Sequence, residues 1–104
     1  MEEIIEGEGE TGQDVSLELG GFLINETRTK AGADFYDMFY AKWTPPQNLF
    51  DYTVTITEQP VPGLATKMFI FVNGEQVLEF FLQPKYDIID QLSGLAADHI
   101  SGYL

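Results

Sequence analysis

Residues 67–84 read KMFIFVNGEQVLEFFLQP, and this stretch decides the fold. Two runs rich in β-branched and aromatic residues flank Asn73-Gly74, the dipeptide that favours a two-residue type I′ turn. The pattern predicts a β-hairpin in which Ile70 lies opposite Val77. Because side chains alternate along each strand, each face of this hairpin carries five apolar residues, and both faces need cover.

A further strand is expected at residues 52–58, YTVTITE, where apolar and polar residues alternate strictly. Tyr52, Val54 and Ile56 point to one side of this strand, and three threonines point to the other. One face of the hairpin must continue the apolar side into the core, and the other must continue the threonine side. The alternation alone does not choose between the two hairpin faces.

Residues 30–43 are expected to form a helix that begins after Thr29, a good N-cap, and ends before Pro45-Pro46. The helix carries two apolar stripes at helical spacing: Phe35, Met38 and Phe39, and Tyr36, Tyr40 and Trp43. We expect the first stripe to lie in the core. The second is either the half-covered rim of the core or a contact surface, since large aromatic side chains dominate interface hot spots.

A closing helix is expected after Pro84. Its apolar stripe consists of Ile88, Leu92, Leu95, Ala96 and Tyr103, with Ile89 and Ile100 beside it. The predicted fold class is therefore α+β: a helix, a three-stranded antiparallel β-meander and a C-terminal helix packed on one sheet face.

The chain of 104 residues is strongly acidic, with 17 Asp and Glu against five Lys and Arg and a formal net charge of −12. This charge argues against nucleic acid as a ligand, because phosphate binding needs a basic footprint. Residues 1–19 hold seven of the acids and no Lys or Arg, so we expect an acidic flexible tail at 1–19 and one domain at 20–104. No run is long and apolar enough to predict membrane insertion.

No residue pattern predicts catalysis, a metal site or a cofactor. The chain has no cysteine, which excludes disulfides and thiolate metal sites. His99 is the single histidine and lies by an apolar stripe, where a packed or surface role is expected, and zinc would need about four ligands. A pair of carboxylates could still meet in the fold and perform acid/base chemistry, so a carboxylate enzyme stays open as an alternative.

From Gly21 onward, the succession of motifs resembles the curli assembly protein family CsgE. The matching pieces are GFLINETRTKAGADFY, an aromatic helix ending in AKW, YTVTITEQP, and VNGEQVLEFFLQP with a closing helix after it. The family shows a similar Gly-x-Asp-Phe-Tyr helix that ends in Lys-Trp. It also has two strands that meet at an Asn turn and end in Phe-Leu-x-Pro. The resemblance covers roughly residues 21–88.

The resemblance implies a non-enzymatic accessory factor in the periplasm of a Gram-negative bacterium. Members of the family bind the outer-membrane curli secretion channel, CsgG, and deliver curlin subunits to it or hold them back from polymerising. They also form a ring-shaped homo-oligomer. The implied partners are thus a CsgG-like channel, curlin subunits and further copies of the chain. The sequence itself shows no signal-peptide core, so the expected compartment rests on the resemblance.

The resemblance also chooses between the hairpin faces. The family tends to carry Thr where this chain has Phe69 and Phe71, so their face is expected to point away from the helices. That face would form an association surface made of Phe69, Phe71, Leu78, Phe80 and Leu82. Trp43, at the family's Lys-Trp position, is a further contact candidate, together with Tyr36 and Tyr40.

The opposite hairpin face would then join the core, with Met68, Ile70, Val72, Val77 and Phe81. Glu79 falls on this face, and burying an unpaired carboxylate is costly, so the assignment requires Glu79 to reach water at an edge. The alternative function is a generic small α+β protein-binding module with no chaperone role. In that case residues 20–28 or the closing helix would cover the extra hairpin face.

Overall fold

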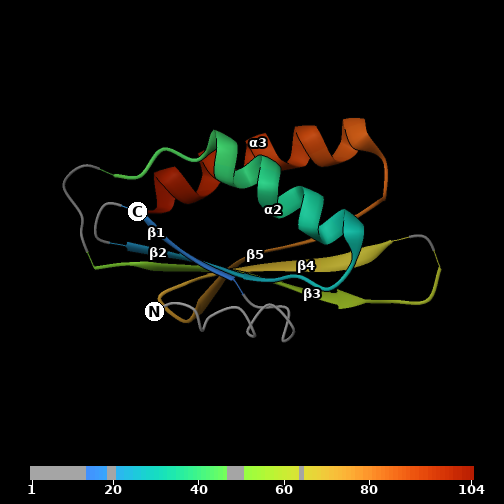
Figure 1. The fold of residues 1–104 in the computed structure, drawn as a ribbon, viewed down its shortest axis with the longest axis horizontal. Helices are drawn as coiled ribbons and strands as arrows, with labels where there is room; N and C mark the ends of the chain where they lie inside the picture. The colour runs from blue at the N-terminus through green and yellow to red at the C-terminus, as the bar shows by residue number, and fades with distance from the viewer. Residues whose placement is uncertain (1–13, 19–20, 47–50, 64) are drawn as a thin grey trace.

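The computed structural model describes residues 14–18, 21–46, 51–63 and 65–104. Its strands are β1 (Asp14–Glu18), β2 (Gly21–Glu26), β3 (Thr53–Pro60), β4 (Thr66–Val72) and β5 (Glu75–Leu82), and its helices are α2 (Lys30–Lys42) and α3 (Tyr86–Tyr103). The strands form one sheet in the order β1-β2-β3-β4-β5. Both helices lie on the same face of this sheet and pack against each other (Figure 1).

The α+β class is confirmed, but the sheet is larger than the predicted three-stranded antiparallel meander. β3, β4 and β5 form that meander. β2 pairs with β3 in parallel, with Leu23 beside Val54, and β1 pairs with β2 antiparallel. Parallel neighbours need a crossover connection. The helix α2 is therefore the crossover of a β2-α2-β3 unit, rather than a helix that precedes the sheet.

The sequence signal for β2 is weak, and its weakness explains why the prediction missed this strand. The apolar run 22–24 is short, and Asn25 follows it. In the structure, Leu23 is fully buried whereas Phe22 is 45% exposed. The Asn25 Oδ1 atom accepts hydrogen bonds from the backbone N and the Oγ1 of Thr27, at 2.9 and 2.7 Å. This local turn ends the strand and leads into α2.

The strand β1 lies inside the segment 1–19, for which composition predicts an acidic flexible tail. Residues 14–18 instead pair with β2, from Asp14 opposite Asn25 to Glu18 opposite Gly21. Backbone hydrogen bonds to a neighbouring strand can order a segment whatever the polarity of its side chains. Residues 1–13 and 19 lie outside the described residues, so the domain boundary at residue 19 stays a prediction.

The helix α2 begins after Thr29 as predicted, and the Thr29 Oγ1 atom accepts a hydrogen bond of 3.1 Å from the Gly32 backbone N. Of the predicted core stripe, Phe35 and Phe39 are fully buried, and Met38 is partly buried against the core. Their ring centroids are 6.2 Å apart. A column of aromatic rings therefore runs along the side of α2 that faces the sheet.

The buried face of α3 is rotated from the predicted stripe. Its buried residues are Ile89, Ser93, Ala96, Ala97 and Ile100. Leu95 is 58% exposed and Tyr103 is 49% exposed, although the prediction counted both toward the core side. Small residues on the buried face allow α3 to approach α2 closely, and the larger leucines lie along the margin of the core.

Candidate functional site

A β-bulge in β5 changes which side chains of the hairpin face the helices. The turn Asn73-Gly74 forms as predicted, with φ angles of 53° and 84°. Pairing is regular up to Gln76, and the next pair along the ladder is Ile70 with Leu78, which leaves Val77 as an extra residue. The predicted pair of Ile70 with Val77 is wrong. Every side chain of β5 beyond the bulge consequently points to the side opposite to the predicted one.

The bulge divides the predicted association surface between the two faces of the sheet. Three of its five hairpin residues lie on the helix side: Leu78, Phe80 and Leu82. Leu82 is fully buried, and the ring of Phe80 lies 5.3 Å from the ring of Phe35. Phe69 and Phe71 remain on the other side of the sheet and are half-buried. The five residues therefore do not form one surface.

The same bulge removes the difficulty with Glu79. This residue and Phe81 point away from the helices, and the Oε2 atom of Glu79 forms an ion pair of 2.6 Å with the Nζ of Lys67. The hydrogen bond from Lys67 holds the pKa of the Glu79 carboxyl below its ordinary value. The Lys67 Nζ also lies 5.7 Å from the ring centroids of Phe69 and Phe81. The prediction that Phe81 joins the core is wrong, because Phe81 is 59% exposed.

The second aromatic stripe of α2 divides in a similar way. Tyr36 and Trp43 are buried, and the Trp43 ring stacks on Phe39 at 5.7 Å and meets Tyr52 edge-on at 6.4 Å. Tyr40 is 44% exposed. Of the three residues predicted as contact candidates on this helix, only Tyr40 presents a large part of its side chain. Replacing Trp43 would therefore test folding rather than partner contact.

The outer sheet face is our name for the side of the sheet that faces away from the helices. Its apolar side chains on β2, β4 and β5 are Phe22, Ile24, Phe69, Phe71 and Phe81. Phe22 is 45% exposed and Phe81 is 59% exposed. Both described helices lie on the opposite face (Figure 1). Sequence reasoning missed three of these five residues, because β2 and the bulge were not foreseen.

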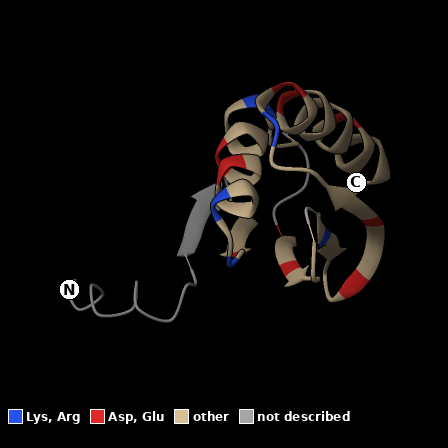
Figure 2. Cartoon of the chain, turned by 90° about the vertical axis from the view of Figure 1, so that its right-hand side faces the viewer, with Lys and Arg blue, Asp and Glu red and all other residues tan. Residues whose placement is uncertain are grey.

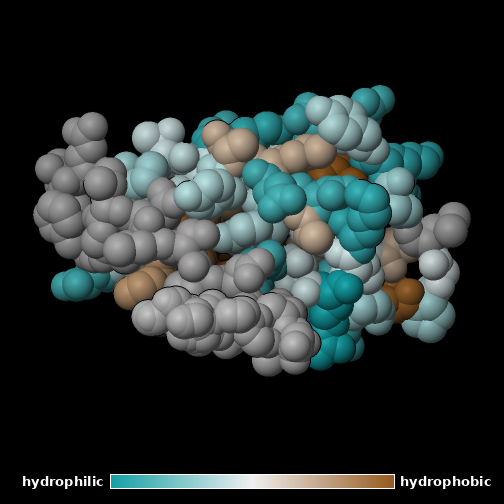
Figure 3. All heavy atoms as spheres, viewed as in Figure 1, coloured by the Kyte–Doolittle hydropathy of each residue, from teal (hydrophilic) through white to brown (hydrophobic). Residues whose placement is uncertain are grey.

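The side of the molecule drawn in Figure 3 differs in surface hydropathy from the outer sheet face. There the described residues are mostly hydrophilic, and hydrophobic side chains show in separate areas between them. The two aromatics of β2 and β5 with large exposed fractions, Phe22 and Phe81, belong instead to the outer sheet face. Aromatic side chains are enriched in protein–protein interfaces relative to the rest of the surface. The outer sheet face is therefore the candidate contact surface for a partner.

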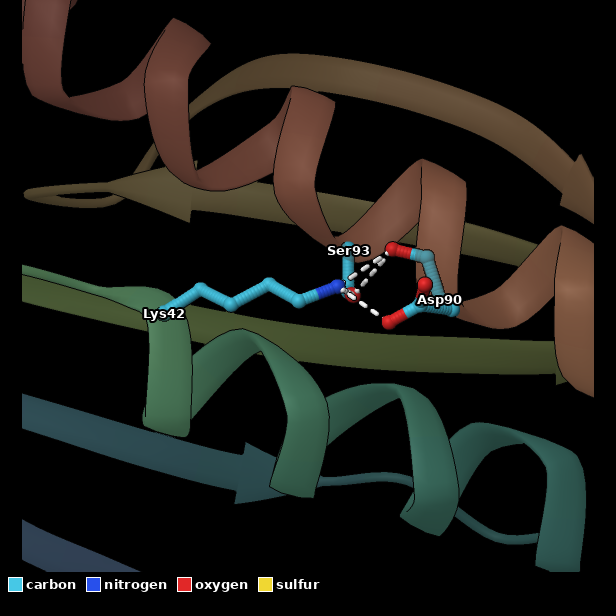
Figure 4. Close-up of polar contacts among 3 residues, drawn as sticks. All are labelled: Lys42, Asp90 and Ser93. Carbon is cyan, nitrogen blue, oxygen red and sulfur yellow. Dashed lines mark hydrogen bonds and ion pairs between the residues drawn. The ribbon is translucent and has the colours of Figure 1, made fainter.

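Lys42, at the Lys-Trp position, links α2 to α3 through hydrogen bonds of its side chain (Figure 4). Its Nζ atom donates to the backbone O and the Oδ1 of Asp90, at 2.5 and 2.7 Å, and to the Oγ of Ser93 at 2.9 Å. The Ser93 hydroxyl is fully buried and donates to the Asp90 backbone O at 2.8 Å. These hydrogen bonds join the end of α2 to the first half of α3, so the cluster positions α3 against α2.

Glu58 is a buried carboxylate that reaches from β3 to the start of α2. Its Oε1 atom accepts hydrogen bonds from the backbone N atoms of Arg28 and Thr29, at 2.6 and 2.9 Å, and its Oε2 accepts one from the Thr29 hydroxyl. Burial by itself raises the pKa of Glu58, but the bonds from Thr29 and Arg28 together leave it below the ordinary value. The buried Thr66 hydroxyl interacts with the carboxylate more weakly, because its geometry falls short of a hydrogen bond.

The charged groups of the described residues form no cluster that could hold a metal ion. Acidic residues outnumber Lys and Arg on α3 and on the strands, whereas α2 carries two of each kind. Figure 2 shows these charges on the cartoon. In the part of the chain that the structure describes, no group of His, Cys, Asp and Glu could hold a metal ion. His99 is exposed, and a surface position was one of the two positions expected for it. None of the helices among the described residues has the length and apolar character needed to cross a membrane.

The fold and the site together define a small acidic α+β domain with aromatic side chains on its outer sheet face. A family model named curli assembly protein CsgE matches residues 19–104, and the chain belongs to this family. The resemblance drawn from the motifs is thereby confirmed, and its extent reaches beyond residues 21–88. Among curated proteins, no match is found. Curli assembly is thus the role for which the chain's family is named.

Proposed function

We propose that this protein is a non-enzymatic accessory factor of curli secretion that works in the periplasm of a Gram-negative bacterium. It binds a CsgG-like outer-membrane channel, delivers curlin subunits to it or holds them, and acts as a ring-shaped homo-oligomer. The observation that carries the proposal is the family match, which spans residues 19–104 and so includes both helices and four of the five described strands completely.

The outer sheet face supplies a contact surface for this function. It carries aromatic side chains from β2, β4 and β5, and two of them, Phe22 and Phe81, present about half of their area to solvent. Burying an aromatic side chain in an interface contributes about 1.5 to 3 kcal/mol. We propose that Phe69 and Phe71, predicted as contact residues from the sequence, act as parts of this face. Tyr40 stays a contact candidate on the helix layer.

The acidic charge suits a factor that handles aggregation-prone clients. A net charge of −12 opposes non-specific aggregation of the chain even though apolar side chains are exposed. Such a factor can therefore expose apolar surface to a client without precipitating. The same argument supports the alternative, a generic protein-binding module with no chaperone role. The fibrillation experiment described below distinguishes this module from a client-holding factor.

Channel binding is tested by co-purification. We expect the affinity-tagged protein to retain the CsgG-like channel of its own organism in detergent, and to do so at the channel's periplasmic mouth when the complex is imaged. The variant Phe22→Lys with Phe71→Lys, which alters the outer sheet face, should retain less channel than Tyr86→Lys, which alters an exposed aromatic on α3. Absence of the channel from the eluate of the unaltered protein would contradict the adaptor role.

Client holding is tested by fibrillation. Substoichiometric protein should lengthen the lag before curlin subunits form fibres, as followed by thioflavin fluorescence, because a holding factor covers the surfaces on which subunits polymerise. Unfolded protein at the same concentration serves as the control for charge and composition. An unchanged lag across a concentration series, combined with channel binding, would favour the module without chaperone role.

A further inference from the structure

The sheet ends in an exposed strand with a groove beside it. Among the described strands, none pairs with the side of β5 that faces away from β4. Between β5 and α3 lies an open groove of about 330 Å³, whose apolar lining includes Leu78 and Phe80 from the strand and Leu92 and Leu95 from the helix. Leu95 is 58% exposed, so part of this lining faces solvent.

The part of β5 beyond the bulge is suited to pairing. From Leu78 to Leu82 its register with β4 is regular, and the segment contains no proline. Alternate residues of an edge strand direct backbone N–H and C=O groups outward, where another extended chain can bond to them. The inward side chains of a strand added here would continue the row of Leu78 and Phe80, and would enter the groove under Leu92 and Leu95.

We propose that the edge of β5 from Leu78 to Leu82, together with the groove under α3, is a strand-addition site for an extended segment of a polypeptide client. The backbone of β5 fixes the conformation of the segment, and the groove selects an apolar residue at alternate positions. This inference rests on the proposed function, because a factor that holds polypeptide subunits is one that needs such a site.

Charge complementarity selects the occupant. β5 and α3 together carry five carboxylates and neither Lys nor Arg: Glu75, Glu79, Asp87, Asp90 and Asp98. Lysines from other elements pair with two of them, Glu79 and Asp90, and the rest keep the surroundings of the groove acidic. A second copy of the chain added at this edge would bring the same acidic elements together. A client segment with basic or neutral flanks meets no such repulsion.

A synthetic probe peptide tests the site directly. It carries fluorescein, has Lys at both ends and alternates Val with Thr between them, and its binding to the full chain is followed by fluorescence anisotropy. We expect binding that weakens with added salt. Amide hydrogen exchange should show new protection at residues 78–82. A peptide with proline at its centre, which cannot complete a strand, should bind at least about tenfold more weakly.

Variants of exposed residues on α3 separate the groove from general charge effects. Leu95→Asp and Leu95→Lys both remove the apolar contact and should each weaken probe binding at least about tenfold. The control Tyr86→Asp alters a residue that is 69% exposed and lies outside the groove, and it should leave binding within about twofold. The proposal is overturned if the probe does not bind, if protection appears away from β5, or if only the Lys variant binds weakly, since repulsion of the lysine-ended probe would then explain the loss. Protection of residues 78–82 that grows with protein concentration in the absence of peptide also overturns it, since a second copy then covers the edge.

The fibrillation assay separates failure of this site from failure of the proposed function. If Leu95→Asp lengthens the curlin lag as much as the unaltered protein does, the strand-addition site is wrong while client holding stands. If the unaltered protein binds the probe at β5 but leaves the lag unchanged, the site stands and client holding fails. Loss of both probe binding and lag extension in Leu95→Asp, but not in Tyr86→Asp, supports both.

Discussion

Replacing Glu58 with alanine is expected to lower the free energy of unfolding by about 3 kcal/mol. The carboxylate accepts three hydrogen bonds at the start of α2, two from the backbone N atoms of Arg28 and Thr29 and one from the Thr29 hydroxyl. Its loss leaves these donors without a partner in a site where Glu58 is only 6% exposed. For a domain of this size, the melting temperature should fall by about 15 °C.

Urea denaturation followed by circular dichroism measures this loss. Asp37→Ala is the matched control, because it removes an exposed carboxylate from α2, the helix whose start Glu58 contacts. It should change the free energy of unfolding by about 0.5 kcal/mol or less. A Glu58→Ala variant as stable as the Asp37→Ala variant would mean that the bonds to the start of α2 contribute little.

Gly32 offers a sharper test, because its effect should change sign with the residue at position 58. A Cβ atom on Gly32 would lie 2.1 Å from the Glu58 Oε1, so Gly32→Ala must displace the carboxylate from its three donors. In the Glu58→Ala background this clash is gone, and alanine should stabilise the helix relative to glycine by about 0.5 to 1 kcal/mol. A Gly32→Ala change that is destabilising in both backgrounds would contradict this account.

The pH dependence of stability provides the third measurement on Glu58. Its pKa is lower in the folded chain than in the unfolded chain, so its stabilising contribution is present above the unfolded pKa, near 4.5, and is lost as pH falls through the folded pKa. The stability difference between the unaltered protein and Glu58→Gln should be largest above pH about 5 and shrink in more acidic solution. A constant difference across this range would show that the charge of Glu58 does not contribute.

Glu58 was within reach of sequence reasoning. The alternation that places Tyr52, Val54 and Ile56 on the core side continues by two residues to Glu58. A carboxylate at such a position needs partners, because an unpaired buried charge is costly. The partners could not be predicted, since the backbone donors at residues 28 and 29 come near β3 only through the β2-α2-β3 crossover. The sequence analysis did not predict the parallel strand β2, and without it the position of these donors could not be foreseen.

The hairpin shows the opposite situation, in which the local pattern was clear and the conclusion was wrong. The turn residues fixed the start of the register correctly, but the extra residue Val77 shifted the rest of β5 by one position. A shift of one residue exchanges the two faces of a strand. The position of Glu79 on the predicted core face was the observation that argued against the predicted register. With five apolar residues on each face, hydrophobicity could not resolve the register, and only the unfavourable burial of Glu79 pointed to the bulge.

Replacing Phe22 and Phe71 together with lysine is expected to reduce self-association of the chain by at least about 100-fold. The two residues lie on β2 and β4, the strands that flank β3, so one interface over this part of the outer sheet face would bury both. Phe22 is 45% exposed and Phe71 is half-buried, so the variant should fold. Sedimentation velocity should then show a mass near the 11.7 kDa of one chain, whereas the unaltered protein is expected to sediment as an oligomer.

Lysine is the informative replacement because the chain is acidic. Two lysines bring the formal net charge from −12 toward zero, which weakens repulsion between copies and would by itself favour association. Loss of mass in this variant therefore reflects loss of apolar contact. Tyr86→Lys with Leu95→Lys is the control, because it makes the same change of charge at two exposed residues of α3. If the control dissociates and the Phe22 and Phe71 variant keeps its mass, the chain associates through its helix layer, and the outer sheet face is left for the channel or the client.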